Sequence, residues 1–307
     1  MSRAVTISIL TYKRHQHLRR ALKSALRYAD QVTEIIVVDN AAEPELKSLL
    51  AAEFPDVRYI ASDSNAGCEG RNIGLRAATT PIVITLDDDV ELSSSNCIAE
   101  VETAFSRDPR LACLTFTVTG LDGKVLERDW CHPRPISHAA REFETHFILE
   151  GASALSREKV LSVGGYPAEF FLGHEGVDLS YRLIAAGYRV VHTPRVSTTH
   201  HAAIEHRPDW RVYYYYTRNG IWVVYRSFPP AMAIPRMLAH VATMGFFSLR
   251  AMQIRAYLQG CVDGVRGLSR MDRHNLDARS LKYLSSIRSE RVPLIGRIQR
   301  RLREKIL

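Results

Sequence analysis

Cysteines are few in this chain and stand in no pattern that would hold a metal ion or a disulfide framework. Their number is odd, and no two of them form a CxxC pair: Cys68, Cys97, Cys113, Cys131 and Cys261. Zinc sites and disulfide-rich secreted domains require closely and regularly spaced cysteines. The cysteine pattern therefore excludes both classes and indicates a reducing compartment.

Two glycine-rich phosphate-binding loops are also missing. A dinucleotide-binding domain carries GxGxxG directly after its first strand, but the corresponding segment here, residues 11–17, reads TYKRHQH. The chain also has no GxxxxGK motif followed by Ser or Thr. These absences disfavour a dehydrogenase and a P-loop nucleotidase.

Long hydrophobic runs are absent from the start of the chain. The apolar stretch from Ala4 to Leu10 is short and is interrupted by Thr6 and Ser8. It is too short for a signal peptide or a membrane span, which predicts a protein that is not exported and stays in the cytoplasm. Residues 237–252 are apolar but contain His240 and Arg250, so we expect this segment not to cross a bilayer.

The net positive charge is concentrated at one end of the 307-residue chain. Nine Lys or Arg and two Glu lie between Arg279 and Leu307, and this segment carries most of the net charge of +8. The rest of the chain is nearly neutral, which argues against a nucleic-acid-binding body. Any anionic partner would therefore meet the C-terminal segment.

The first third of the chain alternates between strand-like and helix-like patterns. Continuous apolar runs predict strands over residues 4–10, 34–38, 57–61 and 81–86. Helical spacing predicts helices over residues 15–28, 44–54 and 70–78. Strands that alternate with helices indicate an α/β fold whose parallel sheet is covered on both faces.

Polar residues follow each of the four predicted strands. Thr11, Asp39 with Asn40, the loop 62–71, and the run Asp87 to Asp89 all fall where parallel sheets bind their ligands. Three adjacent carboxylates repel one another and cannot be buried without a compensating charge. The run therefore predicts a ligand or a cation at this sheet edge.

Six motifs, in order along the chain, resemble the inverting nucleotide-sugar glycosyltransferases of the GT-A fold, a family 2-like group. They are ISILTYKR, EIIVVDN, SNAGCEGRNIGL, LDDDVEL, EGASALSREKVLSVGGYP and FFLGHEGVDLSYRLIAAGYRV, and they span roughly Val5 to Pro229. The resemblance implies a GT-A domain over residues 1–228, with a nucleotide-sugar-binding half (1–120) and an acceptor-side half (121–228). A helical, basic C-terminal extension would then cover residues 229–307.

The resemblance also implies a divalent ion, Mn²⁺ or Mg²⁺, which suits hard oxygen ligands and neutralises a diphosphate leaving group. Asp89 would bind the ion, and Asp87 would bind the ion or the donor's ribose or sugar. One of the adjacent residues His200 and His201 would complete the metal shell, and His200 is preferred. Asp88 is assigned to the donor side, and a solvated loop that caps the next helix is the alternative.

The donor implied by the resemblance is a nucleoside-diphosphate sugar with a pyrimidine base, UDP or dTDP. Asp39 would accept the imide N–H of the base, although an Asx-turn explains the same residue without a ligand. Arg71 could offset phosphate charge, and Gly67 would permit close backbone approach. The remaining predicted donor contacts are Thr11, Asn40, Asn65 and Asn72.

The acceptor-side motif departs from the family pattern. Where the family has two adjacent acids, one of them the base, this chain has Glu175 followed by Gly176. Glu175 is our candidate base. Asp178, the other candidate catalytic carboxylate, lies one helical turn before Arg182 and is expected to pair with it.

The C-terminal residues predict a basic amphipathic helix beginning near Pro293. Its apolar stripe is flanked by arginines and suits either an anionic membrane or the protein's own core. The stripe consists of Ile295, Ile298, Leu302 and Ile306. A membrane contact here would place the enzyme at the inner face of the membrane.

These observations predict a metal-dependent inverting glycosyltransferase, a hexosyl- or deoxyhexosyltransferase of glycan, polysaccharide or glycoconjugate synthesis. The acceptor would be a glycan, a lipid-linked molecule or a small molecule, and no nucleic acid is involved. Two alternatives stay open. A sugar-nucleotide pyrophosphorylase needs a glycine-rich basic loop that this chain lacks, and a non-catalytic nucleotide-binding relative is permitted by Gly176.

Overall fold

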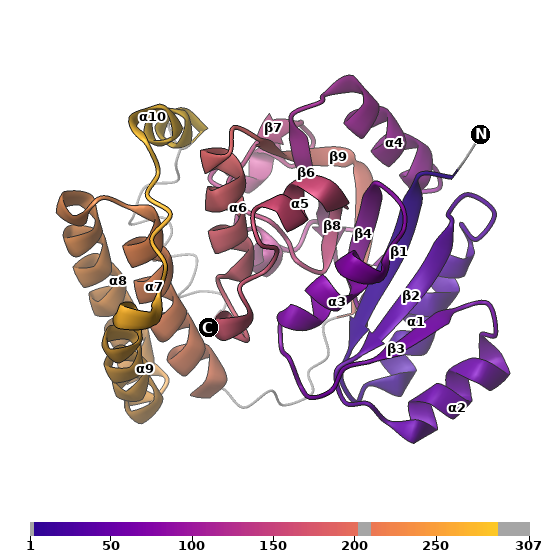
Figure 1. The fold of residues 1–307 in the computed structure, drawn as a ribbon, viewed down its shortest axis with the longest axis horizontal. Coiled ribbons are helices and arrows are strands. Elements are labelled where there is room, and N and C mark those ends of the chain that lie inside the picture. Colours follow the sequence, from indigo (N-terminus) through magenta and orange to yellow (C-terminus); the bar gives the residue numbers. More distant parts are fainter. Residues whose placement is uncertain (1–2, 202–209, 288–307) are drawn as a thin grey trace.

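A nine-stranded mixed sheet forms the centre of the molecule, as seen in the computed structural model, which describes residues 3–201 and 210–287 (Figure 1). The sheet order is β3-β2-β1-β4-β8-β6-β9-β5, with β7 paired to β9. The strands are β1 (Val5–Thr11), β2 (Glu34–Asp39), β3 (Arg58–Ala61), β4 (Ile82–Asp87), β5 (Val90–Leu92), β6 (Leu111–Thr119), β7 (Phe143–Glu144), β8 (Ala152–Ser156) and β9 (Arg189–His200).

The first four strands are parallel, as the alternating pattern predicts. In the register, Thr11 pairs with Asp39 and Leu10 with Asp87, so three polar strand ends meet at one edge of the sheet. Beyond β4 the sheet becomes mixed, because β8 runs antiparallel to both β4 and β6. This antiparallel strand brings residues 150 and 151 beside the end of β4.

Helices cover both faces of the sheet. Leu18, Leu46 and Val101 lie in one buried cluster, on the face covered by α1 (His15–Leu26), α2 (Pro44–Glu53) and α4 (Cys97–Arg107). Leu75 and Leu183 lie in a second cluster, on the face covered by α3 (Glu69–Ala77), α5 (Arg157–Ser162) and α6 (Glu175–Ala185). The predicted α/β fold and the three N-terminal helices are confirmed, with boundaries within two residues for most elements.

The C-terminal part is helical, as predicted. The helices are η4 (Val212–Tyr216, a π-helix), α7 (Thr217–Ser227), α8 (Pro230–Arg250), α9 (Ile254–Gly267) and α10 (Ala278–Ile287). Short 3₁₀ turns complete the secondary structure: η1 (Glu127–Asp129), η2 (Ile136–His138), η3 (Ala168–Phe170) and η5 (Leu268–Arg270). Figure 1 shows α8 and α9 at the end of the molecule opposite α2. Ile221 and Trp222 of α7 join Phe170 in a third buried cluster, which ties these helices to the loop before α6.

Among the described residues, one helix, Pro230–Arg250, is long and apolar enough to cross a membrane by length and composition alone. Its central residues pack against α7, with Met244 and Phe247 buried.

The close packing of α3 on β1 depends on Gly74. A Cβ at this position would collide with the Ser8 hydroxyl and lie 3.4 Å from Val38 Cγ2. We expect Gly74→Ala to lower the free energy of unfolding by roughly 1–3 kcal/mol, the usual cost of overpacking. Chemical denaturation of Gly74→Ala, Ser8→Ala and the double variant tests this, because Ser8→Ala removes the colliding hydroxyl. If the double variant is no more stable than Gly74→Ala, this contact does not limit the packing.

Candidate active site

The Asp87–Asp89 run is compensated mainly by arginines. The Arg14 guanidinium donates to Asp88 Oδ1 at 2.8 Å and to Asp89 Oδ2 at 2.6 Å, and Thr11 Oγ1 donates to Asp88 Oδ2 at 2.8 Å. Asp88 and Asp89 are both buried. Burial raises the pKa of Asp88 to about 7, although Arg14 opposes the shift. Arg14 therefore supplies a counter-charge to the buried carboxylates, and this pairing could not be predicted from the LDDDVEL motif.

His200 lies beside Asp89. Its Nε2 is 3.6 Å from Asp89 Oδ1, and its Nδ1 is 2.7 Å from Asp129 Oδ2. Burial alone would raise the pKa of Asp89, but the hydrogen bonds and charges of His200 and Arg14 outweigh it and hold that pKa below its usual range. The two carboxylates in turn overcome burial and raise the pKa of His200 to about 9. His201 instead pairs with Glu91 at 2.6 Å, so the structure brings His200, and not His201, to the aspartate run.

Asp87 faces the other side of the site, where Arg71 lies between two carboxylates. Arg71 Nη2 is 2.5 Å from Asp87 Oδ1, and Arg71 Nη1 is 3.9 Å from Glu175 Oε1. The backbone fits closely here, because a Cβ at Gly151 would collide with the Asp87 carboxyl group. Arg71 thus connects the predicted donor side of the site to the predicted base.

Glu150 occupies the space beside Gly176. The Gly176 N–H donates to Glu150 Oε1 at 2.8 Å, and a Cβ at position 176 would collide with that oxygen and lie 2.6 Å from the Ile148 carbonyl oxygen. Burial and the charge of Glu175 raise the pKa of Glu150 to about 8, against the opposing effect of Arg71. Burial also raises the pKa of Glu175, again opposed by Arg71. The carboxyl group missing at position 176 is therefore replaced in space by one from the segment before β8.

Asp178 has a different environment. It is 1% exposed and accepts from Arg182 at 2.8 Å, which confirms the predicted i,i+4 pair, and Arg226 lies 3.5 Å away. Arg182 also donates to the Gly165 carbonyl at 2.7 Å. These contacts give Asp178 a structural role in holding α6, and its predicted catalytic role stays untested.

Asp39 and Asn40 are engaged with the backbone in this conformation. The Asp39 carboxylate accepts the N–H groups of Ala41 and Glu43, each at 2.8 Å, and the Tyr59 hydroxyl at 3.0 Å. Asp39 is fully buried, so the observed contacts match the Asx-turn alternative, and base recognition stays a prediction. Asn40 donates to the Gly67 carbonyl oxygen at 2.9 Å and so positions the loop after β3.

Within that loop, Asn65 is exposed and accepts the Gly67 N–H at 3.2 Å. Gly67 has a φ of +54° and lies against Phe171, where a Cβ would collide with the Phe171 carbonyl oxygen. Asn72 is buried; it bonds to Glu69 at 2.5 Å and to the backbone N–H and C=O of Tyr166, each at 2.8 Å. Asn72 therefore ties α3 to the loop before η3, and its donor contact stays a prediction.

The turn that delivers Glu175 is held in an unusual conformation. Phe171 and His174, neither of them glycine, have φ values of +63° and +66°. Asn219 on α7 donates to the carbonyl oxygens of Leu172 and Gly173, each at 2.8 Å. Left-handed backbone at non-glycine residues persists only where the surroundings fix it, and α7 supplies that fixation.

Three residues that shape this site, Arg14, Asp129 and Glu150, were not predicted from the sequence. Arg14 follows the first strand in the segment TYKRHQH, whose basic character was the available signal. Asp129 is one of two acidic residues in η1, and nothing in the sequence linked it to His200. Glu150 directly precedes the GAS segment, and its position in that motif was the signal to consider.

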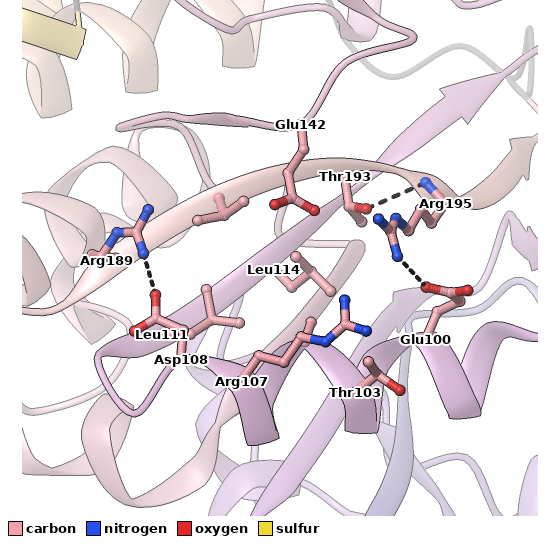
Figure 2. A pocket seen from close by; sticks show the side chains of 12 residues that line it. Glu100, Thr103, Arg107, Asp108, Leu111, Leu114, Glu142, Arg189, Thr193 and Arg195 are labelled. Carbon is pink, nitrogen blue, oxygen red and sulfur yellow. Dashed lines mark hydrogen bonds and ion pairs between the residues drawn. The ribbon is translucent and has the colours of Figure 1, made fainter.

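A separate pocket of about 130 Å³ lies among α4, β6 and β9 (Figure 2). None of the predicted site residues lines it. Arg189 pairs there with Asp108, and Arg195 is 3.4 Å from Glu100, so its charges largely satisfy one another. This pocket is not the candidate active site.

The arrangement supplies an acid-rich sheet edge with two arginines, a histidine, the buried Glu175 and the half-buried Glu150. Among residues 3–201 and 210–287, no group of three or more His, Cys, Asp or Glu side chains is arranged so that it could hold a metal ion. Asp89 and His200 are adjacent, while Asp87 is engaged by Arg71.

Comparison with known proteins identifies the family of this chain. Residues 6–164 match the family model described as glycosyl transferase family 2. The chain belongs to this family, and it is a glycosyltransferase. The resemblance inferred from the six motifs is thereby confirmed.

Two relatives illustrate the family. N-acetylglucosaminyl-diphospho-decaprenol L-rhamnosyltransferase of Mycobacterium tuberculosis is 26% identical over 239 residues, which cover 66% of this chain and 78% of that protein. The succinoglycan biosynthesis protein ExoO of Rhizobium meliloti is 32% identical over 124 residues, which cover 40% of this chain and 36% of that protein.

Solved structures share the GT-A fold. GalNAc-T7 with UDP, GalNAc and Mn²⁺ superimposes with a TM-score of 0.62 at 15% identity, covering 92% of this chain and 56% of that one. The mannosyltransferase PcManGT from Pyrobaculum calidifontis, in complex with GDP-Man and Mn²⁺, has a TM-score of 0.56 at 17% identity. This superposition covers 98% of this chain and 88% of the mannosyltransferase chain.

The raised pKa of Glu150 has a consequence for stability. Its folded pKa of about 8 lies above the value near 4.5 for an ordinary glutamate, so the native state holds a proton that the unfolded chain releases. This contribution to stability is fully present below about pH 4 and is lost as the pH rises through 8. Without divalent ions, we expect the free energy of unfolding to fall from pH 5 to 8 less steeply in Glu150→Gln than in the wild type. Identical slopes in urea titrations would show that Glu150 is already ionised.

Proposed function

We propose that the chain is a metal-dependent, inverting glycosyltransferase that moves a sugar from a nucleoside diphosphate to an acceptor hydroxyl. The observation that carries this proposal is the arrangement of Asp89, His200 and Asp129 beside Arg71 and the two glutamates. The part around Asp89 and His200 suits a cation and a diphosphate, and the part around the two glutamates suits the removal of a proton.

The residues at the aspartate run fit a divalent ion. Two ligand atoms that each lie about 2.1 Å from one ion are separated by roughly 3–4 Å, and Asp89 Oδ1 and His200 Nε2 are 3.6 Å apart. Asp129 holds the other ring nitrogen at 2.7 Å, as carboxylates commonly do behind a metal-bound histidine. Asp89 and His200 would hold Mn²⁺ or Mg²⁺, with Asp87 as the further predicted ligand. Two structures of similar fold contain Mn²⁺.

The bound ion would supply neutralisation of the diphosphate leaving group. Arg14 keeps Asp88 and Asp89 in place before a ligand arrives. Arg71 lies 2.5 Å from Asp87 and can turn its charge-assisted hydrogen bonds toward a phosphate. Thr11, Asp39, Asn40, Asn65, Gly67 and Asn72 remain the proposed lining of the donor site.

Inversion requires a carboxylate that takes the proton of the acceptor hydroxyl on the side opposite the leaving nucleotide. Glu175 is the proposed base, because it begins α6 directly behind the constrained turn and lies 3.9 Å from Arg71. Glu150 is the second candidate, since it fills the space that a side chain at position 176 would take.

The donor and acceptor are proposed as classes. Solved structures of similar fold carry UDP in one case and GDP-Man in the other, and a UDP or dTDP sugar is our proposal for this chain. The rhamnosyltransferase relative, whose name specifies a diphospho-decaprenol acceptor, supports hexosyl or deoxyhexosyl transfer to a lipid-linked or glycan hydroxyl. Synthesis of a polysaccharide or glycoconjugate in the cytoplasm follows from the same proposal. The predicted basic amphipathic helix beginning near Pro293, for which a membrane surface and the protein's own core are the two alternatives, lies outside the described residues.

Family membership favours transfer over the pyrophosphorylase alternative. A non-catalytic relative would bind nucleotide without turnover, so a screen of nucleotide sugars with Mn²⁺ for hydrolysis and transfer separates the two.

Metal dependence is tested at Asp89. Asp89→Ala removes a buried metal ligand and should abolish turnover, whereas the protein should remain folded because Asp88 still pairs with Arg14. The measurement is the transfer rate with Mn²⁺, with Mg²⁺ and with EDTA, beside melting curves. Glu91→Ala, which removes a carboxylate paired only with His201 among the described residues, serves as the control and should stay active. Full wild-type activity in EDTA would contradict the proposal.

The base is tested by three amide substitutions. Glu175→Gln should keep its affinity for the donor and lose roughly 10²–10⁴-fold in turnover, the usual contribution of general acid–base catalysis. Asp178→Asn should mainly lower the melting temperature, because it weakens the buried pair with Arg182. Transfer rates at saturating donor decide the assignment. A large loss confined to Glu150→Gln would make Glu150 the base, and a folded, inactive Asp178→Asn would move the role to Asp178.

A further inference from the structure

The outer face of α8 is apolar, and no residue that the structure describes covers it. Ile234, Leu238, Phe246 and Leu249 recur at helical spacing, and each of these side chains is between 48% and 66% exposed. Isolated exposed apolar residues are common on protein surfaces, but a continuous stripe marks an interaction site.

α9 extends this stripe. Ile254, Leu258, Val262 and Val265 lie on its exposed side, and Gly260 and Gly264 on the opposite side pack closely against η4 and α7. The connection between α8 and α9 is only three residues long, and the Tyr257 hydroxyl donates to the Val241 carbonyl oxygen at 3.1 Å. The two helices therefore form a hairpin that presents one apolar surface.

The tip of the hairpin combines apolar and basic side chains. Met252 is 90% exposed, and its φ of +56° is a conformation that glycine or asparagine adopts at lower cost. Arg250 and Arg255 flank it and are exposed. This side chain contributes almost nothing to the core and is available to a partner at the tip.

The charge of the hairpin is predominantly positive. Between Pro230 and Met271 the only acidic residue is Asp263, which accepts the Tyr214 hydroxyl at 2.8 Å. Arg250, Arg255 and Arg266 form no ion pair with any residue that the structure describes. This surface is therefore complementary to an anionic partner that also accepts apolar side chains.

An anionic bilayer fits these properties better than a second copy of the chain. A two-fold interface places the same patch on both partners, so it would offer the unpaired arginines no acidic side chain of the hairpin other than Asp263. A bilayer surface offers phosphate groups to the arginines and acyl chains to the apolar stripe.

The hairpin is suited to lie on a membrane and not to cross it. Met244 and Phe247 are buried on the inner side of α8, and His240 lies 3.1 Å from the Tyr216 carbonyl oxygen. A helix with one face fixed to α7 in this way cannot be surrounded by lipid.

We propose that the outer face of the α8–α9 hairpin binds an anionic phospholipid bilayer, with Leu249 and Met252 inserted at the headgroup boundary. This surface is distinct from the segment beyond residue 287 and does not depend on the sugar or nucleotide that the enzyme uses. It would hold the active site next to a membrane.

The test is flotation of the full-length protein with vesicles of phosphatidylcholine alone and of phosphatidylcholine with phosphatidylglycerol. We expect wild-type protein to float with the anionic vesicles only. Leu249→Glu with Met252→Glu should lower the partition coefficient at least about 10-fold. Arg250→Gln with Arg255→Gln should lower it roughly 30-fold, at about 1 kcal/mol for each basic residue.

The matched control is Ala51→Glu with Ala52→Glu, which adds the same charge to the exposed side of α2 at the other end of the molecule. It should float like the wild type, and all variants should keep the wild-type melting temperature. Equal flotation of the tip variants and the wild type would overturn the proposal and assign binding to another segment. Absence of wild-type flotation with either kind of vesicle would also overturn it. Light scattering provides a third outcome. If the wild type is a dimer, and the Leu249→Glu, Met252→Glu variant is a monomer that floats like the wild type, the face is a contact between copies and the proposal is overturned.

Discussion

The pairing of Arg14 with two buried aspartates is the interaction on which the site depends. Without it, Asp88 and Asp89 would be uncompensated charges at the end of β4, and breaking such a pair costs several kcal/mol. The pairing holds the end of β4 in the conformation in which, as proposed, it would bind a cation. Asp89 also contacts His200, whose second nitrogen is held by Asp129. The site is therefore stable before ligands arrive and charged where they would bind.

A second balance of charge operates on the acceptor side. Arg71 is the cation that faces Asp87, Glu175 and Glu150, and one positive charge cannot neutralise three carboxylates. Burial, together with the charge of Glu175, raises the pKa of Glu150 against the opposing charge of Arg71. Binding of a donor phosphate would alter the balance, because Arg71 would then share its hydrogen bonds with the ligand. In the proposed function, the protonation of the two glutamates would thus be linked to the occupancy of the donor site.

The parallel half of the fold could be predicted from the sequence because each element carries its own periodic pattern. β1, β2 and β4 are continuous buried runs, and their polar ends meet as predicted. The position of Asn72 was not predictable, because its partner Tyr166 lies far along the chain. Glu150 and Asp129 escaped prediction for the same reason: their roles arise from contacts with Gly176 and His200 that only the folded chain creates.

The central claim is that Asp89 and His200 bind a divalent ion together with a nucleoside diphosphate. Pulsed electron paramagnetic resonance of Mn²⁺ tests it directly, because an imidazole ligand couples its ¹⁴N nucleus to the metal electron. With UDP present, the wild type should bind Mn²⁺ and show the nitrogen coupling, and His200→Gln should lose the coupling. Asp89→Ala should lose Mn²⁺ binding. Tight Mn²⁺ binding to Asp89→Ala, or a bound ion without nitrogen coupling in the wild type, would contradict the account.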